Sequence, residues 1–68
     1  MRDWLRTIRH MKGLSEKAVA TAAGIAQPVY HRIEVGQSNP SVKTAKAIGR
    51  VLGVDWTLFF TDEKGVTA

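Results

Sequence analysis

The fold is decided by residues 13–41, GLSEKAVATAAGIAQPVYHRIEVGQSNPS. This stretch contains two short runs whose apolar residues recur at helical spacing, and the residues from Ala23 to Ala26 separate them. Gly24 lies in this connection, and a glycine there accepts the positive φ that ends one helix, so that the next helix leaves at a steep angle. The stretch therefore predicts two helices joined by a tight turn, with the second helix projecting from the molecule.

These two helices also carry signals at their ends. Ser15 is expected to cap the first helix, because its hydroxyl can accept a hydrogen bond from a backbone N–H group of the first turn. The second helix is predicted over residues 27–35, and Pro28 is compatible with its first turn, where N–H groups have no partner within the helix. The residues expected to face inward from both helices are Val19, Ala20, Ala23, Tyr30 and Ile33.

Three further helices are predicted around this pair. Apolar residues at helical spacing predict a helix from Asp3 to Lys12. Ser41 is expected to cap a helix that ends before Gly53, and Asp55 is expected to cap a short helix through Phe60. The residues expected to face inward from these helices are Trp4, Leu5, Ile8, Met11, Val42, Ala45, Ile48, Leu52 and Phe59.

The fold class that follows is all-α, with five helices in one domain. The chain has 68 residues, close to the smallest size at which one hydrophobic core can hold a domain folded. No useful length of sequence alternates apolar and polar residues, so nothing predicts a sheet. The single domain is expected to span residues 1–68, with its core over about residues 3–60 and a polar tail at 61–68 that frays.

The charge of the chain is concentrated in its first three quarters. The net charge is +4 at pH 7. Residues 1–50 carry nine Lys and Arg against three Asp and Glu, whereas residues 51–68 carry one Lys against three Asp and Glu. A basic segment of this kind favours a polyanionic partner, and that partner is expected to bind within residues 1–50.

The composition also excludes several classes of protein. The chain has no cysteine and only two histidines, His10 and His31, so neither a disulfide framework nor a metal site is expected, and no cofactor is expected. No apolar run is long enough to span a membrane, and the charged N-terminal residues do not fit a signal peptide. The sequence therefore predicts a soluble, cytoplasmic protein that does not associate with membranes.

The motifs along the chain resemble those of the Cro and repressor type of helix-turn-helix proteins, also called the XRE family. The resemblance covers about Leu5 to Phe60. The matching residues are Gly13-Leu14-Ser15, Ala20, Gly24-Ile25, Arg32-Ile33-Glu34-Val35-Gly36, Asn39-Pro40-Ser41 and Leu52-Gly53-Val54. The resemblance implies a lambda-repressor-like fold and a transcriptional regulator that binds double-stranded DNA. An enzyme is not expected, because no nucleophile lies beside a candidate base and His31 with Glu34 lacks a third ligand.

The resemblance further implies that the helix at residues 27–35 lies in the major groove, where each base pair presents a distinct pattern of donors and acceptors. Gln27 can form two hydrogen bonds with adenine, and Arg32 can form two with guanine. Val29 and the ring of Pro28 can pack on a thymine methyl group. The implied base-contacting residues are Gln27, Pro28, Val29, His31 and Arg32.

Phosphate contacts are implied at the start of the first helix of the motif and in the loop after the second. The residues at these positions are Ser15, Lys17, Gln37, Ser38 and Lys43. Arg9 and Glu34 match positions that pair in relatives, which would join the first helix to the helix at 27–35. Arg9 then either contacts the DNA backbone or forms a purely structural ion pair with Glu34, and the sequence does not distinguish the two.

Three residues depart from the family pattern. Glu16 stands where a glutamine usually contacts a phosphate, so a carboxylate is expected near the polyanion. Ala26 stands where a serine or threonine usually caps the recognition helix, which costs about 1 kcal/mol. Val35 replaces the usual asparagine before Gly36. These departures predict modest DNA affinity or a partner that assists binding.

Two functions remain open from the sequence. The first is a repressor that occludes a promoter, acting as a homodimer on two half-sites, with no small-molecule ligand. Trp4, Trp56, Phe59 and Phe60 could form a dimer patch, although Trp4 and Phe59 are expected in the core and Trp56 is the one expected to be exposed. The alternative is an antitoxin-like or anti-regulator module of the same fold that binds a protein partner.

Overall fold

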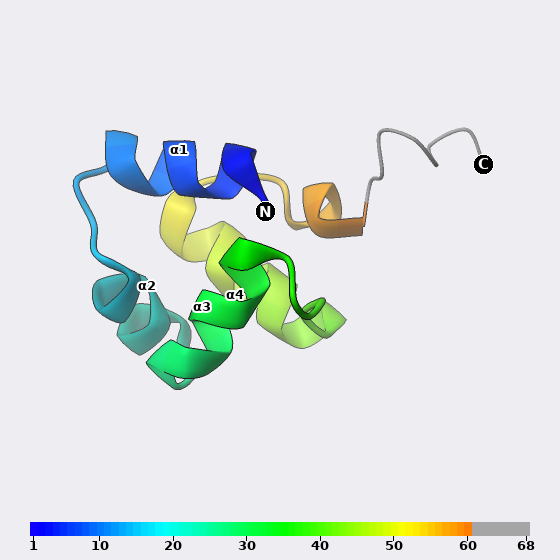
Figure 1. Ribbon diagram of the computed structural model, residues 1–68. Helices are drawn as coiled ribbons and strands as arrows, with labels where there is room; N and C mark the ends of the chain where they lie inside the picture. The colour runs from blue at the N-terminus through cyan, green and yellow to red at the C-terminus, as the bar shows by residue number, and fades with distance from the viewer. Residues whose placement is uncertain (61–68) are drawn as a thin grey trace.

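The computed structural model describes residues 1–60, which form four α-helices and one 3₁₀ helix (Figure 1). The elements are α1 (Asp3–Met11), α2 (Glu16–Ala23), α3 (Gln27–Val35), α4 (Val42–Leu52) and η1 (Trp56–Phe60). No strand occurs in this part of the chain, so the all-helical class is confirmed for it. The polar tail expected at residues 61–68 lies outside the described residues. None of the helices within residues 1–60 is long and apolar enough to cross a membrane.

The expected fifth α-helix is wrong in type, because residues 56–60 form a 3₁₀ helix instead. Asp55 does cap this element: its Oδ1 accepts a hydrogen bond from the backbone N–H of Thr57 at 3.0 Å. Five residues are too few for a stable α-helical turn with several internal hydrogen bonds, and short segments of this kind adopt the tighter 3₁₀ geometry.

The serine caps are confirmed at both predicted positions. The Ser15 hydroxyl accepts a hydrogen bond from the N–H of Ala18 at 3.0 Å, and the Ser41 hydroxyl accepts one from the N–H of Thr44 at 3.1 Å. Ala26 at the start of α3 provides no such bond. The first turn of α3 therefore has no side-chain cap at its N-terminus.

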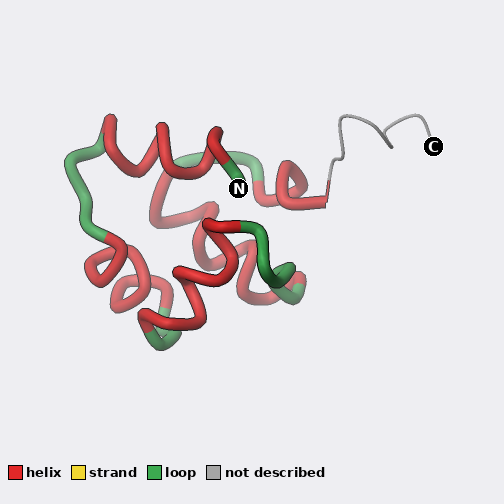
Figure 2. Tube along the Cα trace, viewed as in Figure 1, coloured by secondary structure: helices red, strands yellow, loops and turns green. Residues whose placement is uncertain are grey.

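The turn between α2 and α3 supplies part of the support of α3. Gly24 has φ of 77°, in the left-handed region that a glycine enters without steric cost. The N–H of Ile25 donates to the carbonyl of Ala20 at 3.0 Å, which closes the end of α2, and the Ile25 side chain packs against the core. The connection is one of the short loops between helices in Figure 2. It fixes the direction in which α3 leaves α2.

The core lies where α1, α2, α3 and α4 meet, and η1 closes it at one side. The rings of Trp4 in α1 and Phe59 in η1 lie edge to face, with centroids 5.1 Å apart. Trp56, expected to be exposed, is half-buried, and its ring lies beneath the Lys46 ammonium at 5.1 Å. The buried apolar residues are Leu5, Val19, Ala20, Tyr30, Ile33, Ala45, Ile48, Leu52 and Phe59.

Two residues expected in the core are exposed. Met11 is 80% exposed, because it lies about 120° around α1 from Leu5 and the inward position nearest the end of the helix is taken by Arg9. Val42 is 49% exposed because it is the first residue of α4, and the buried face of that helix begins one turn later at Ala45. The spacing of apolar residues predicted the helices correctly, but it did not show which apolar residues at the helix ends are covered by the rest of the molecule.

Gly49 allows α4 to approach the segment that leads into η1. It is buried, and a Cβ atom added there would lie 2.8 Å from the carbonyl oxygen of Val54 and 3.3 Å from Cβ of Trp56. A contact of 2.8 Å to backbone requires that backbone to move. The glycine is therefore set by packing, in a helix where alanine would otherwise be favoured.

We expect Gly49→Ala to lower the free energy of unfolding by about 1–3 kcal/mol, because the added methyl group overpacks this contact. The gain in helix propensity of roughly 0.5–1 kcal/mol works in the opposite direction. Urea unfolding followed by circular dichroism measures the balance. Ala47→Gly in the same helix is the control for propensity. A Gly49→Ala variant more stable than the native chain would contradict the packing argument.

Candidate nucleic-acid interface

Helix α3 has one buried face and one exposed face. Tyr30, Ile33 and Glu34 are buried against the rest of the molecule. The residues of α3 that were expected to contact bases all lie outside this buried face and are exposed. These exposed residues are Gln27, Pro28, Val29, His31 and Arg32.

The residues expected to contact phosphates come from three separate segments. Lys17 is in the first turn of α2, Gln37 is in the loop after α3, and Lys43 is in the first turn of α4, and all three are exposed. Ser15 is exposed, but its hydroxyl is engaged as the cap of α2. Ser38 is half-buried, and its carbonyl accepts a hydrogen bond from Nη1 of Arg2 at 3.2 Å.

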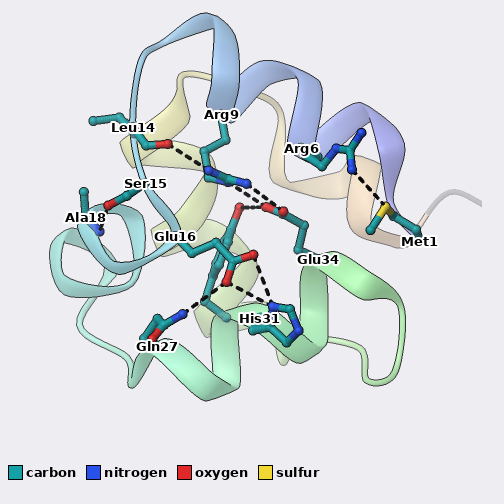
Figure 3. A network of polar contacts seen from close by, with 11 residues as sticks. Met1, Arg6, Arg9, Leu14, Ser15, Glu16, Ala18, Gln27, His31 and Glu34 are labelled. Carbon is teal, nitrogen blue, oxygen red and sulfur yellow. Dashed lines mark hydrogen bonds and ion pairs between the residues drawn. The ribbon is translucent and has the colours of Figure 1, made fainter.

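A buried ion pair joins α1 to α3 (Figure 3). Nε of Arg9 donates to Oε1 of Glu34 at 2.8 Å, and Nη2 donates to Oε2 at 2.9 Å. The third nitrogen, Nη1, donates to the carbonyl of Leu14 at 2.9 Å. The two side chains are 10% and 2% exposed. The structure thus brings together the two residues expected to pair, and the hydrogen bonds of the Arg9 guanidinium point into the molecule.

Tyr30 completes this buried network. Its hydroxyl donates to Oε1 of Glu34 at 2.8 Å, one turn away on the same helix. Burial alone would raise the pKa of Glu34, but the hydrogen bonds from Arg9 and Tyr30 and the Arg9 charge outweigh it and hold that pKa below its ordinary value. The hydrogen bond to Glu34 raises the pKa of Arg9. Burial, followed by the bond to Glu34, raises the pKa of Tyr30. At neutral pH the network is therefore a carboxylate held by two donors.

Arg2 anchors the loop that follows α3, which the sequence analysis did not anticipate. Its guanidinium donates to the carbonyls of Ile33 and Ser38 and to Oδ1 of Asn39, and it lies 5.7 Å from the centroid of the Phe59 ring. Burial lowers the pKa of Arg2. No local pattern marks this role, because Arg2 precedes α1 and its partners lie more than 30 positions away.

Glu16 connects the two helices of the motif on the exposed side. Its Oε1 accepts a hydrogen bond from Nε2 of Gln27 at 3.2 Å. Nδ1 of His31 lies 3.0 Å from Oε1 and 3.2 Å from Oε2 of the same carboxylate. Figure 3 shows the Glu16 side chain reaching from α2 to these two side chains of α3. From the sequence, Glu16 was expected only to place a negative charge near DNA, and no local pattern predicted either contact.

We expect Tyr30→Phe to lower the free energy of unfolding by about 1.5–3 kcal/mol, because the variant removes a buried hydrogen bond to a charged group. Phenylalanine keeps the aromatic ring, so the core packing is preserved. Chemical unfolding at pH 7 measures the loss. An unchanged unfolding midpoint would show that the hydroxyl adds nothing to the Arg9–Glu34 pair.

The depressed pKa of Glu34 predicts how stability depends on pH. The folded-state pKa lies below the ordinary value of 4.5, so this group contributes its full stabilisation above about pH 4.5. The contribution is lost as the pH falls through the folded-state pKa. Titration of the Glu34 carboxyl carbon by NMR, alongside unfolding from pH 3 to 7, checks both statements. A midpoint above 4.5 would contradict the assigned effect of Arg9 and Tyr30.

Comparison with known proteins places this geometry in a family. A helix-turn-helix family model matches residues 5–59. An uncharacterized HTH-type transcriptional regulator of Bacillus subtilis, YqaF, is 48% identical over 62 residues, which cover 91% of this chain and 82% of YqaF. An uncharacterized HTH-type transcriptional regulator of Haemophilus influenzae is 41% identical over 49 residues, covering 72% of this chain and 50% of that protein.

A third relative is an SPbeta prophage-derived uncharacterized HTH-type transcriptional regulator of B. subtilis, YonR. It is 34% identical over 50 residues, covering 74% of this chain and 46% of YonR. This chain thus spans most of YqaF but only about half of the other two relatives. No solved structure gives a significant match. The family model and the relatives agree with the turn and helix geometry described above, and the chain belongs to the XRE-type helix-turn-helix family of DNA-binding transcriptional regulators.

Proposed function

We propose that this regulator recognises a specific double-stranded DNA sequence by placing α3 in the major groove. The observation that carries the proposal is that α3 buries Tyr30, Ile33 and Glu34 against the molecule and leaves Gln27, Val29, His31 and Arg32 exposed. The major groove is wide enough for one helix and displays a different pattern for each base pair. A helix that is fixed on one side and open on the other matches this requirement.

Arg32 is the residue best suited to read a guanine. Its side chain is exposed and makes no hydrogen bond or ion pair with any of residues 1–60. All donors of its guanidinium are therefore free for the O6 and N7 atoms of guanine. Gln27 and His31 each have one side-chain nitrogen in contact with the Glu16 carboxylate. Val29 and Pro28 are exposed and offer apolar surface to a thymine methyl group.

Contacts to the DNA backbone are assigned to the exposed polar residues around α3. Lys17, Gln37 and Lys43 are exposed. Ser15 lies two residues before Lys17, and Ser38 directly follows Gln37. Arg9 is assigned to the structural bridge, because its three nitrogens already donate to Glu34 and Leu14. Phosphate contacts of lysine release counterions, so the affinity should fall as salt concentration rises.

We further propose that the protein acts as a homodimer and represses by occluding a promoter. One small module buries only about 600–1,000 Å² of protein surface on DNA, whereas two modules on half-sites one helical turn apart double this contact. Phe60 is 48% exposed and lies 6.1 Å from the half-buried ring of Trp56, which makes these two rings the candidate dimer patch. Trp4 and Phe59 stack within the fold and are not part of it.

The experiment that tests the proposal is a binding selection from a randomised pool of duplexes at near-physiological salt. Enrichment of a palindrome with half-sites about one helical turn apart supports a dimeric, sequence-specific regulator. If no sequence is enriched and only steeply salt-dependent binding remains, specific recognition by α3 is wrong. A pull-down then tests the alternative, an antitoxin-like module that binds a protein partner.

We expect two substitutions to act differently on DNA binding. Arg32→Ala should cost about 1–3 kcal/mol and relax the preference at one base pair, because it removes a contact to a base. Lys17→Ala should weaken binding to all sequences equally and lower the salt slope by about one unit, because it removes a phosphate contact. Fluorescence anisotropy with the selected duplex and its point variants measures both. A uniform loss for both variants would contradict the assignment of α3 as the recognition helix.

A further inference from the structure

His31 and Glu16 form a contact whose chemistry fixes where the proton of the imidazole lies. Nδ1 of His31 lies within 3.2 Å of both carboxylate oxygens of Glu16. An ionised carboxylate only accepts hydrogen bonds, so Nδ1 must be the nitrogen that carries hydrogen. The Glu16 side chain is 21% exposed and the His31 side chain is 52% exposed. The contact therefore covers one side of the imidazole and leaves the other open.

The open side of the ring carries Nε2. This nitrogen makes no hydrogen bond with any of residues 1–60. In a neutral imidazole with hydrogen on Nδ1, Nε2 holds a lone pair and accepts a hydrogen bond. In an imidazolium, Nε2 carries hydrogen and donates instead. The group that His31 presents on the exposed face of α3 thus depends on Glu16 and on the protonation of the ring.

Gln27 is oriented by the same carboxylate. Its amide nitrogen donates to Oε1 of Glu16, so the amide oxygen is directed away from that contact. Gln27 and His31 are four residues apart on α3 and lie on the same side of the helix. One carboxylate on α2 consequently sets the donor and acceptor pattern of two neighbouring side chains on the recognition face.

We propose that Glu16 is a positioning residue for base recognition, which holds His31 with hydrogen on Nδ1 so that Nε2 accepts a hydrogen bond from a base amino group. In the major groove the groups that fit are N4 of cytosine and N6 of adenine. The inference rests on the proposed function, because it requires the exposed face of α3 to meet base edges. It adds which chemical class of base His31 selects.

The carboxylate of Glu16 also acts on Arg9 of α1 and Glu34 of α3. Glu16 contributes to the raised pKa of Arg9 and to the lowered pKa of Glu34, so its carboxylate lies within electrostatic reach of that buried network.

The first test uses the free protein and a measurement that does not depend on DNA. Long-range ¹H–¹⁵N spectra of the imidazoles at about pH 8 distinguish hydrogen on Nδ1 from hydrogen on Nε2. We expect hydrogen on Nδ1 for His31 in the native chain and in Glu16→Gln, which keeps an acceptor, and on Nε2 in Glu16→Ala. His10, whose side chain is exposed and makes no hydrogen bond within residues 1–60, is the internal control. Hydrogen on Nε2 of His31 in the native chain overturns the proposal.

The second test measures base preference on the selected duplex. His31→Ala identifies the base pair that His31 reads, and duplexes with each base at that position are then compared at about pH 8. We expect the native chain to prefer cytosine or adenine at that position. Glu16→Ala should lose a roughly two- to tenfold preference at pH 8, as for one hydrogen bond, and Glu16→Gln should keep it.

The outcomes separate this inference from the proposed function. If the native chain selects a sequence and Arg32→Ala relaxes one base pair, but neither His31→Ala nor Glu16→Ala changes any preference, then only the inference about Glu16 is wrong. If the native chain selects no sequence at all, both are wrong. Circular dichroism of each variant checks that the fold is intact, and Ser15 still caps α2 in the Glu16 variants.

Discussion

The buried pair of Arg9 and Glu34 is the constraint on which the rest of the structure depends. Two charges removed from water are costly unless they meet, and breaking such a pair by removing one partner typically costs about 3–5 kcal/mol. The pair exists only when α1 and α3 are placed as observed and when Glu34 faces inward. A rotation of α3 that exposed Glu34 would leave Arg9 buried without its counter-charge. The ion pair therefore determines which face of α3 is presented to solvent, and Tyr30 reinforces that choice through its hydrogen bond to the same carboxylate.

The remaining supports of α3 act at its two ends. At the start, Gly24 and Ile25 close α2 and set the direction of α3, while Ala26 provides no side-chain cap. At the end, Arg2 holds the loop that follows by donating to the carbonyls of Ile33 and Ser38. Only Tyr30 and Ile33 contribute buried apolar side chains from α3. A helix with so small an apolar face depends on polar contacts from Arg9 in α1 and from Arg2, which precedes α1. These contacts therefore hold α3, a helix of only nine residues, against the rest of the molecule.

Most of the fold could be predicted from the sequence because its signals are local. The boundaries of α3, the caps at Ser15 and Ser41 and the turn at Gly24 follow from residue types at fixed spacing. Met11 and Val42 were placed wrongly because periodicity gives the direction of a side chain but not whether another helix covers it. The contacts of Arg2 and of Glu16 could not be predicted, since both join segments whose relative placement is known only after the helices have packed. The base-contacting and phosphate-contacting assignments remain predictions, although all five residues expected to contact bases are exposed.

The position of Glu16 at the start of α2 suits a carboxylate. A negative charge at the start of α2 is favoured by the helix dipole, which adds stability where the first N–H groups lack partners. Oε1 of Glu16 accepts a hydrogen bond from Gln27, Nδ1 of His31 lies within 3.2 Å of both carboxylate oxygens, and the Glu16 side chain is 21% exposed. If α3 binds DNA as proposed, these contacts order Gln27 and His31 in advance, and ordering in advance lowers the entropic cost of binding. In that proposal, the departure of Glu16 from the family pattern replaces a phosphate contact with contacts that orient two side chains of α3.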